Sequence, residues 1–123
     1  MAIIDIAKRE KEDDFHATRY YSSKQESSIA KSLDGVQQIN SGATPFAKGD
    51  VICDDWLIEC KTKESETKSF SIKREWLDKN SSEALFMGKK YNALAFNFGP
   101  NTPNYYVLDE CTFKELMNMK LPK

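Results

Sequence analysis

A chain of 123 residues is long enough for one domain with a single hydrophobic core, and its apolar content is ordinary for a soluble globular protein. The formal net charge of −1 argues against broad attraction to nucleic acid, because most nucleic-acid-binding domains carry a clear basic excess. No apolar run approaches the roughly 20 residues that cross a bilayer, and residues 1–14 mix both charges, so we expect a cytoplasmic protein without a membrane span or signal peptide.

The cysteine and histidine content argues against a zinc site. Cys53, Cys60 and Cys111 lack the spacing of metal-ligand pairs, and His16 is the only histidine available to complete a set. We therefore expect three free thiols, two of them in or beside the hydrophobic core.

The start of the chain is expected to differ from the rest. Residues 1–21 alternate basic and acidic side chains and carry few large apolar groups after Ile6. We expect a charged arm or a loosely attached helix there, followed by a folded domain over residues 22–123. His16 lies in this arm and has no partner in the sequence, so we expect a surface histidine rather than a catalytic one.

The first helix of the domain is expected to begin near Ser23. Ser23 and Glu26 fit a capping box, with serine at the N-cap and glutamate three residues later. Ile29 and Leu33 belong to a buried stripe, and Gly35 suits a left-handed cap after the last turn. Glu26 lies on the same stripe, so two interpretations stay open: a capping residue, or a carboxylate carried inward towards a metal.

A strand is predicted for residues 36–40, followed by a small polar loop over residues 41–45. Gly42 allows this loop to approach a ligand closely. Ser41 has two readings, as a contact to phosphate or water and as an ordinary turn serine.

Two short strands joined by a tight turn are predicted for residues 49–61. Apolar, β-favouring residues flank Asp54 and Asp55, a pair that tolerates turn conformations. A symmetric turn places Asp50 directly opposite Glu59 on the neighbouring strand.

This register creates an electrostatic problem. Asp50 and Glu59 would lie roughly 5 Å apart and repel by about 3 kcal/mol at an effective dielectric constant of about 20. Protonation of one carboxylate, neutralisation by Lys61 on the same face, or a divalent cation would offset the repulsion. Oxygen ligands suit hard cations such as Mg²⁺ and Mn²⁺. The alternative is a solvated hairpin face with an ordinary carboxylate–lysine cluster.

A second helix is predicted from Ser71, as its N-cap, to Gly88, with an interruption near residues 80–82. Lys73 and Arg74 lie at its start, where basic side chains oppose the helix dipole unless an anion such as phosphate binds there. Ordinary solvated charges are the alternative. Residues 61–90 hold eight basic and five acidic side chains, so a local basic surface is compatible with the net charge.

The remaining elements complete an α/β fold. Residues 92–98 predict a buried strand, reached from the hairpin by a right-handed parallel crossover. Residues 105–108 predict an edge strand, and residues 112–119 a short helix capped by Thr112. The expected order is α-β-β-β-α-β-β-α, a mixed sheet of about five strands flanked by helices.

Two short motifs resemble a known nuclease family. Gly49-Asp50, followed after a hairpin by Glu59-Cys60-Lys61, resembles the PD-(D/E)XK nuclease signature, with Gly49 replacing the proline of that motif. The stretches 40–43 (NSGA) and 48–51 (KGDV) look like the Holliday-junction-resolvase-like branch, which includes small phage-encoded members. The resemblance covers roughly residues 25–116 and implies a restriction-endonuclease-like domain.

The resemblance also implies a function. It implies a metal-dependent DNA endonuclease that hydrolyses phosphodiester bonds with Mg²⁺, or with Mn²⁺ as a substitute. The metal-binding and catalytic residues would be Asp50, Glu59, the Cys60 backbone carbonyl, Glu26 and Lys61. The candidate contacts to nucleic acid are Ser41, Lys48, Lys63, Lys73 and Arg74. A homodimer that cuts branched DNA is implied too, acting in a host cell if the protein is phage-encoded.

Two other classes of function compete with this interpretation. One is a catalytically inactive nucleic-acid-binding domain of the same fold, and the other is a small interaction protein with a charged hairpin. The intact set of Asp50, Glu59 and Lys61 argues against the inactive domain, because such a domain has no need to hold these charges together. A saturable Mn²⁺ site would argue against the interaction protein.

Overall fold

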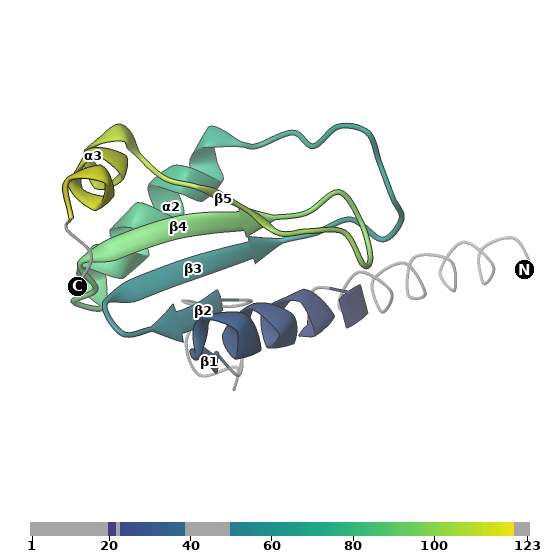
Figure 1. The fold of residues 1–123 in the computed structure, drawn as a ribbon, viewed down its shortest axis with the longest axis horizontal. Coiled ribbons are helices and arrows are strands. Elements are labelled where there is room, and N and C mark those ends of the chain that lie inside the picture. The colour runs from purple at the N-terminus through teal and green to yellow at the C-terminus, as the bar shows by residue number, and fades with distance from the viewer. Residues whose placement is uncertain (1–19, 22, 39–49, 120–123) are drawn as a thin grey trace, which may run out of the picture.

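A five-stranded mixed sheet organises residues 20–21, 23–38 and 50–119, the part of the chain that the computed structural model describes. The strands follow one another across the sheet in the order β1-β2-β3-β4-β5 (Figure 1). All neighbours are antiparallel except β3 and β4, which are parallel. The predicted α/β class and mixed sheet are confirmed. The elements after the first helix are β1 (Val36–Gln37), β2 (Asp50–Cys53), β3 (Trp56–Lys61), α2 (Arg74–Phe86), β4 (Tyr91–Phe96), β5 (Tyr105–Val107) and α3 (Glu110–Asn118).

Two helices lie on opposite faces of this sheet (Figure 1). The N-terminal helix, described at residues 20–21 and 23–33, lies on the face that carries the hydrophobic core. Helix α2 packs against β3 and β4 on the other face. We call these the N-helix face and the α2 face. Side chains alternate along each strand, so consecutive strand residues point to different faces. The core on the N-helix face consists of Ile29, Val51, Ile58, Cys60, Ala93 and Ala95.

The β2–β3 hairpin has the predicted register. Asp54 takes the left-handed turn conformation with φ 49°, which aspartate tolerates better than most residues. Cys53 pairs with Trp56 next to the turn, and Asp50 pairs with Glu59 at the far end. A slip by one residue would have moved one carboxylate to the other face, so this register is what places both on the same side.

Helix α2 connects β3 to β4, and the parallel pairing of these strands confirms the predicted parallel connection. Two details are corrected. The N-cap is Lys73 rather than Ser71, and no side chain caps the helix there. The helix also runs without a break through Asn80, because the buried Asn80 amide donates a hydrogen bond to the Ala93 carbonyl oxygen at 2.9 Å. As predicted, the helix ends before Gly88, which has a φ of 72°.

The start of the N-terminal helix differs from the prediction. Tyr20, Tyr21 and Ser23 are all helical, so Ser23 does not have the non-helical conformation of an N-cap. The capping box is therefore wrong. Glu26 has a different partner, which is described with the candidate site.

The end of this helix also differs in detail. Asp34, rather than Gly35, adopts the left-handed conformation, with φ 55°. Gly35 serves a close approach between the helix end and β2. A Cβ atom at Gly35 would lie 2.8 Å from the Ile52 carbonyl oxygen, so a side chain there would push the two apart.

The C-terminal elements follow the prediction with one correction. β5 lies at the edge of the sheet, as expected. The N-cap of α3 is Asp109 rather than Thr112, because the Asp109 side chain accepts a hydrogen bond from the Thr112 backbone N–H at 2.6 Å.

β1 occupies only residues 36–37 of the predicted strand, whose last two residues lie outside the described part of the chain.

The loop between β3 and α2, residues 62–73, is tied to the loop that follows β4. The Thr67 N–H donates a hydrogen bond to the Phe98 carbonyl oxygen at 2.7 Å. Gly99, with φ 136°, lies so close that a Cβ atom there would be 2.5 Å from the Glu66 Cα atom. The two loops therefore meet through their backbones, and only glycine fits at the contact.

The described residues bear on the expected membrane span and cysteine state. Among the described residues, no helix is long and apolar enough to cross a membrane. The three cysteines are free, as predicted. Ser41 and Lys48, and most of the N-terminal arm with His16, lie outside the described residues, and the proposed boundary between arm and domain stays a prediction.

Candidate active site

Strands β2 and β3 place two buried carboxylates side by side. Asp50, the first residue of β2, pairs with Glu59 of β3. The exposed fraction is 2 % for Asp50 and 7 % for Glu59. One oxygen of each, Asp50 Oδ1 and Glu59 Oε2, is buried without a hydrogen-bond partner. Their neighbours Val51 and Ile58 point into the core on the N-helix face, so the carboxylates lie on the α2 face.

The two carboxylates are electrostatically unfavourable in this position. Burial, followed by the charges of Glu59 and Glu83, raises the pKa of Asp50 from 3.8 to about 8, and Lys79 opposes the shift. Burial also raises the pKa of Glu59, while Lys61 and Lys79 lower it. Without a cation, the site therefore favours a protonated Asp50 at neutral pH. A divalent cation would favour the ionised pair.

Lys61 lies on the same face as the two carboxylates, as predicted. Its Nζ atom is 3.6 Å from Glu59 Oε1 and 4.5 Å from the centroid of the Trp76 ring. The Lys61 side chain is 31 % exposed, so its ammonium group reaches the solvent-facing side of the site. The structure thus brings together Asp50, Glu59 and Lys61.

Glu83 of α2 is a third buried carboxylate on this face, and the sequence analysis missed it. It is 6 % exposed, its Oε1 atom has no hydrogen-bond partner, and Lys79 Nζ lies 3.7 Å from that oxygen. Its charge contributes to the raised pKa values of Asp50 and Glu59. A signal was present in the sequence, because Glu83 is a charged residue on the buried stripe of its helix, as Glu26 is.

Glu26 lies on the opposite face of the sheet from this set, although its charge contributes to the raised pKa of Asp50. It is 7 % exposed, and its Oε2 atom accepts a hydrogen bond from Gln37 Nε2 at 2.9 Å. Gln37 pairs with Val51, which points into the core, so Glu26 lies on the N-helix face, opposite to Asp50. Burial raises the pKa of Glu26, and the hydrogen bond from Gln37 lowers it. A role for Glu26 as a metal ligand stays a prediction.

Basic side chains cover aromatic rings next to Lys61. Lys73 Nζ lies 5.7 Å from the centroid of the Trp76 ring that Lys61 also covers. Lys63 Nζ lies 5.3 Å from the centroid of the Phe70 ring. The rings of Phe70 and Trp76 are 6.4 Å apart, so the three lysines belong to one surface. We call this surface the basic strip; it consists of Lys61, Lys63, Phe70, Lys73 and Trp76.

Two other candidate residues lie outside the basic strip. Arg74 is 91 % exposed, and its Nε atom lies 3.5 Å from Asp78 Oδ2 in an ion pair along α2. The Cys60 side chain is buried in the core on the N-helix face. The Cys60 backbone carbonyl as a metal ligand stays a prediction.

The residues present fit a hard divalent cation. Mg²⁺ is usually bound by one or two carboxylates and completes its shell with water and substrate phosphate oxygens. Asp50 and Glu59 supply two carboxylates with unpartnered oxygens. Over residues 20–21, 23–38 and 50–119, no group of three or more His, Cys, Asp or Glu side chains is arranged to hold an ion alone. The pair therefore fits an open site that water and substrate complete.

Comparisons of the chain with protein-family models, with curated proteins and with solved structures find no match. The functional argument therefore depends on the residues and geometry of the site.

Proposed function

We propose that the protein is a Mg²⁺-dependent endodeoxyribonuclease that hydrolyses phosphodiester bonds. The observation that carries the proposal is the buried pair of Asp50 and Glu59, each with an unpartnered oxygen, next to Lys61. Two carboxylates in this position destabilise the fold unless a positive charge joins them, and a function explains why they are there. The resemblance of Gly49-Asp50 and Glu59-Cys60-Lys61 to a nuclease signature supports the same conclusion.

Asp50, Glu59 and the Cys60 carbonyl are the groups that would hold the ion. When bound, the ion would lower the pKa of a coordinated water and stabilise negative charge on the scissile phosphate. The carboxylates contribute two negative charges from a buried position, where electrostatic attraction is stronger than in bulk water. Glu83 increases the negative potential on this face, and Lys79 moderates it. The proposal does not require Glu26, which lies on the other face.

Lys61 is assigned a positioning role. The Lys61 ammonium group lies 3.6 Å from the Glu59 carboxylate, as an ion pair. An ammonium group donates hydrogen bonds to a water molecule or a phosphate oxygen but has no lone pair to accept a proton. We therefore assign to Lys61 the orientation of the attacking water and the neutralisation of the phosphate, rather than the role of general base.

The basic strip supports a nucleic-acid substrate. Lysine ammonium groups bind phosphates without regard to sequence, and Trp76 and Phe70 hold them through cation–π contacts. Lys73 is also the N-cap of α2, where backbone N–H groups without a side-chain cap attract phosphate. A DNA strand that binds along the basic strip would pass beside Lys61 and the two carboxylates.

The central test is the Asp50→Asn substitution, with Asp55→Asn as its control. Asp55 is an exposed turn residue of the same hairpin. We expect Asp50→Asn to abolish cleavage and to weaken Mn²⁺ binding in calorimetry, with the fold retained, and the control to keep both. Unchanged Mn²⁺ affinity in Asp50→Asn would refute the metal site. DNA binding without cleavage in the unmodified protein would indicate the inactive binding domain, and the lack of a saturable Mn²⁺ site would indicate an interaction protein.

The substrate and assembly are part of the proposal through the resemblance to the resolvase-like branch. A two-fold pair would present two metal sites to a symmetric branched substrate. We therefore propose a homodimer that prefers four-way junctions over linear duplex. The test compares cleavage of junction, flap and linear DNA, with sizing of the free protein. A monomer that cuts all three alike would keep the nuclease and remove the resolvase-like assignment.

A further inference from the structure

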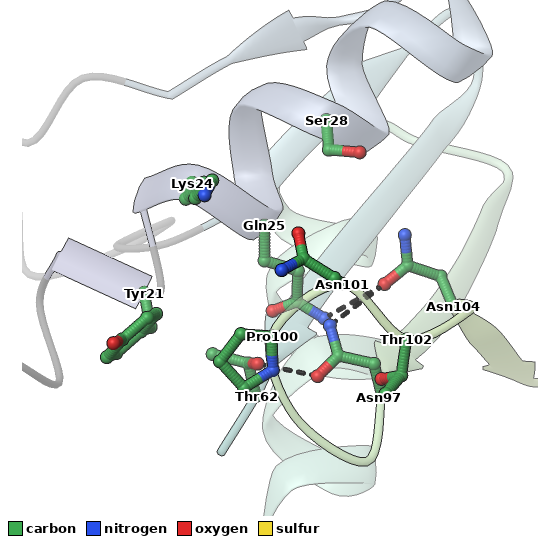
Figure 2. Close-up of a pocket in the computed structure, with 10 residues that line it drawn as sticks. All are labelled: Tyr21, Lys24, Gln25, Ser28, Thr62, Asn97, Pro100, Asn101, Thr102 and Asn104. Atoms are coloured by element: carbon green, nitrogen blue, oxygen red, sulfur yellow. Dashed lines mark hydrogen bonds between the residues drawn. The ribbon is translucent and has the colours of Figure 1, made fainter. Parts of the chain in front are cut away.

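A polar pocket lies between the N-terminal helix and the ends of β3 and β4. It is formed by the N-terminal helix, the residue after β3 and the loop that follows β4 (Figure 2). Its volume is about 120 Å³. A cavity of about 150 Å³ holds one benzene ring, so this smaller pocket fits the edge of a flat base, and its opening to solvent leaves room for the rest of the ring system. We call it the amide pocket, because Gln25, Asn97, Asn101 and Asn104 line it.

Hydrogen bonds fix the orientation of the inner amides. Gln25 Nε2 donates to the Lys61 carbonyl oxygen at 2.7 Å. Asn97 Oδ1 accepts from the Thr62 hydroxyl group at 2.6 Å, and Asn97 Nδ2 donates to Asn104 Oδ1 at 3.2 Å. Turning the Gln25 amide over would set its oxygen against the Lys61 carbonyl, so the assignment of its two ends is determined. The pocket is therefore preorganised in the free protein.

Gln25 Oε1 is the atom that points to a ligand. Gln25 is 5 % exposed, and this oxygen is buried without a hydrogen-bond partner. Figure 2 shows it directed to the side of the pocket where Tyr21 and Pro100 lie. A structural role would be complete with the bond from Nε2 to Lys61, whereas a buried acceptor without a donor is unfavourable. A ligand with an N–H donor would satisfy it.

The other lining residues indicate the chemical class of this ligand. Tyr21 supplies an aromatic ring, and Lys24 an ammonium group, from the same helix as Gln25 (Figure 2). An aromatic face, amides and a cation together match a nucleotide. The ring stacks on the base, the amides bond to the base edge, and the ammonium group binds the phosphate. The Gln25–Lys61 hydrogen bond joins the pocket to the Lys61 backbone at the end of β3, while the Lys61 side chain lies on the α2 face.

We propose that the amide pocket holds one unpaired base of the bound DNA at the end of β3 and β4, with the amino group of adenine or cytosine donating to Gln25 Oε1. The base must be unpaired, because pairing and stacking in a duplex occupy the edge and the faces that the pocket would contact. Unpaired thymine has a single N–H donor, N3–H, between two carbonyl acceptors that would repel the Gln25 oxygen, whereas adenine and cytosine present an exocyclic amino group. This inference deepens the proposed function and extends it from DNA cleavage to selection of substrates with an unpaired base near the cut.

The test measures binding in the presence of EDTA, so that the result does not depend on cleavage. The full chain is titrated with short single-stranded oligonucleotides of dA, dC or dT and followed by fluorescence anisotropy. We expect dA and dC to bind about tenfold more tightly than dT, which corresponds to one additional hydrogen bond. Equal affinity for the three, or no binding, would overturn the proposal and would mean that Gln25 Oε1 is satisfied by water alone.

A matched pair of tyrosine variants supplies the second arm. Tyr21→Leu removes the stacking ring and should weaken dA binding at least about fivefold. Tyr20→Leu changes the neighbouring residue, which is 61 % exposed and does not line the pocket, and should leave affinity unchanged. Equal effects of the two variants would also overturn the proposal. A chain that selects dA over dT yet does not cleave DNA would refute the nuclease alone, and a chain that cleaves without base selection would refute the pocket alone.

Discussion

Replacing Asp50 with asparagine should make the metal-free protein less sensitive to pH. Burial raises the pKa of Asp50 from 3.8 to about 8, so between these values the folded protein holds a proton that the unfolded chain has released. A carboxyl group with a raised folded pKa contributes its full stability below the unfolded pKa. That contribution is lost as the pH rises towards the folded pKa. Asparagine keeps the shape of the side chain and has no proton to lose.

The magnitude follows from one proton. Inside this window, the free energy of unfolding falls by about 1.4 kcal/mol for each unit of pH. From about pH 5 to about pH 7, Asp50 alone should therefore cost the folded protein about 3 kcal/mol. Asp50→Asn should lack this part of the pH dependence. Over the same range, its free energy of unfolding should rise by about 3 kcal/mol relative to that of the unmodified protein.

The measurement is urea unfolding in EDTA across this pH range, for the unmodified protein, Asp50→Asn and the control Asp55→Asn. The exposed Asp55 should give the same profile as the unmodified protein. Addition of Mg²⁺ should restore stability near neutral pH in the unmodified protein and should have little effect on Asp50→Asn, because a ligand stabilises only the state that binds it. Parallel profiles for the unmodified protein and Asp50→Asn would show that Asp50 does not titrate in this window, and the reasoning would fail.

Three further substitutions test the surroundings of the pair. Glu83→Gln removes a charge that raises the pKa of Asp50. In EDTA, the free energy of unfolding should therefore stop falling at a lower pH than in the unmodified protein. An unchanged pH dependence would show that Glu83 does not act on Asp50. Glu26→Gln keeps an acceptor for Gln37 and lies on the other face, so Mn²⁺ affinity should not change; because burial raises the pKa of Glu26, the free energy of unfolding in EDTA should depend less on pH. A loss as large as that of Asp50→Asn would place Glu26 at the ion. Lys73→Ala should weaken binding to all DNA sequences alike and reduce the salt slope by about 1, and a loss confined to some sequences would contradict a phosphate contact.

The hairpin and its carboxylate pair were predictable because the information that fixes them is local. Apolar residues on both sides of Asp54 and Asp55 fix the turn, and the turn fixes the register. Once the register is known, the side-chain alternation of strands decides that Asp50 faces Glu59 and that Lys61 lies on the same side. No contact from a distant element is needed for this step.

The contribution of α2 was not predictable in the same way. Which turn of a helix lies over a given strand residue depends on how the helix packs on the sheet. Here Asn80 anchors α2 to the Ala93 carbonyl, and this contact brings Glu83 towards the pair. The sequence suggested a break at Asn80, because a polar residue in a helix is ambiguous until its partner is known.

The N-cap of α3 and the amide pocket were also not predicted from the sequence. Asp109 and Thr112 are both good N-cap residues three positions apart, and local preference alone does not choose between them. The pocket joins Gln25 to Lys61 and Asn104, which are 36 and 79 positions away. Contacts at such separations leave no periodic pattern in the sequence.

The backbone contact at Gly99 bears on the thermodynamics of the proposed DNA binding. It ties the 62–73 loop, which carries Lys63 and Lys73, to the rest of the fold before any DNA is present. The conformational entropy of that loop is therefore lost during folding, and association with phosphates does not have to order it. A larger residue at position 99 would separate the two loops and transfer this entropy loss to the binding step. Affinity would then fall although no group that contacts DNA had changed.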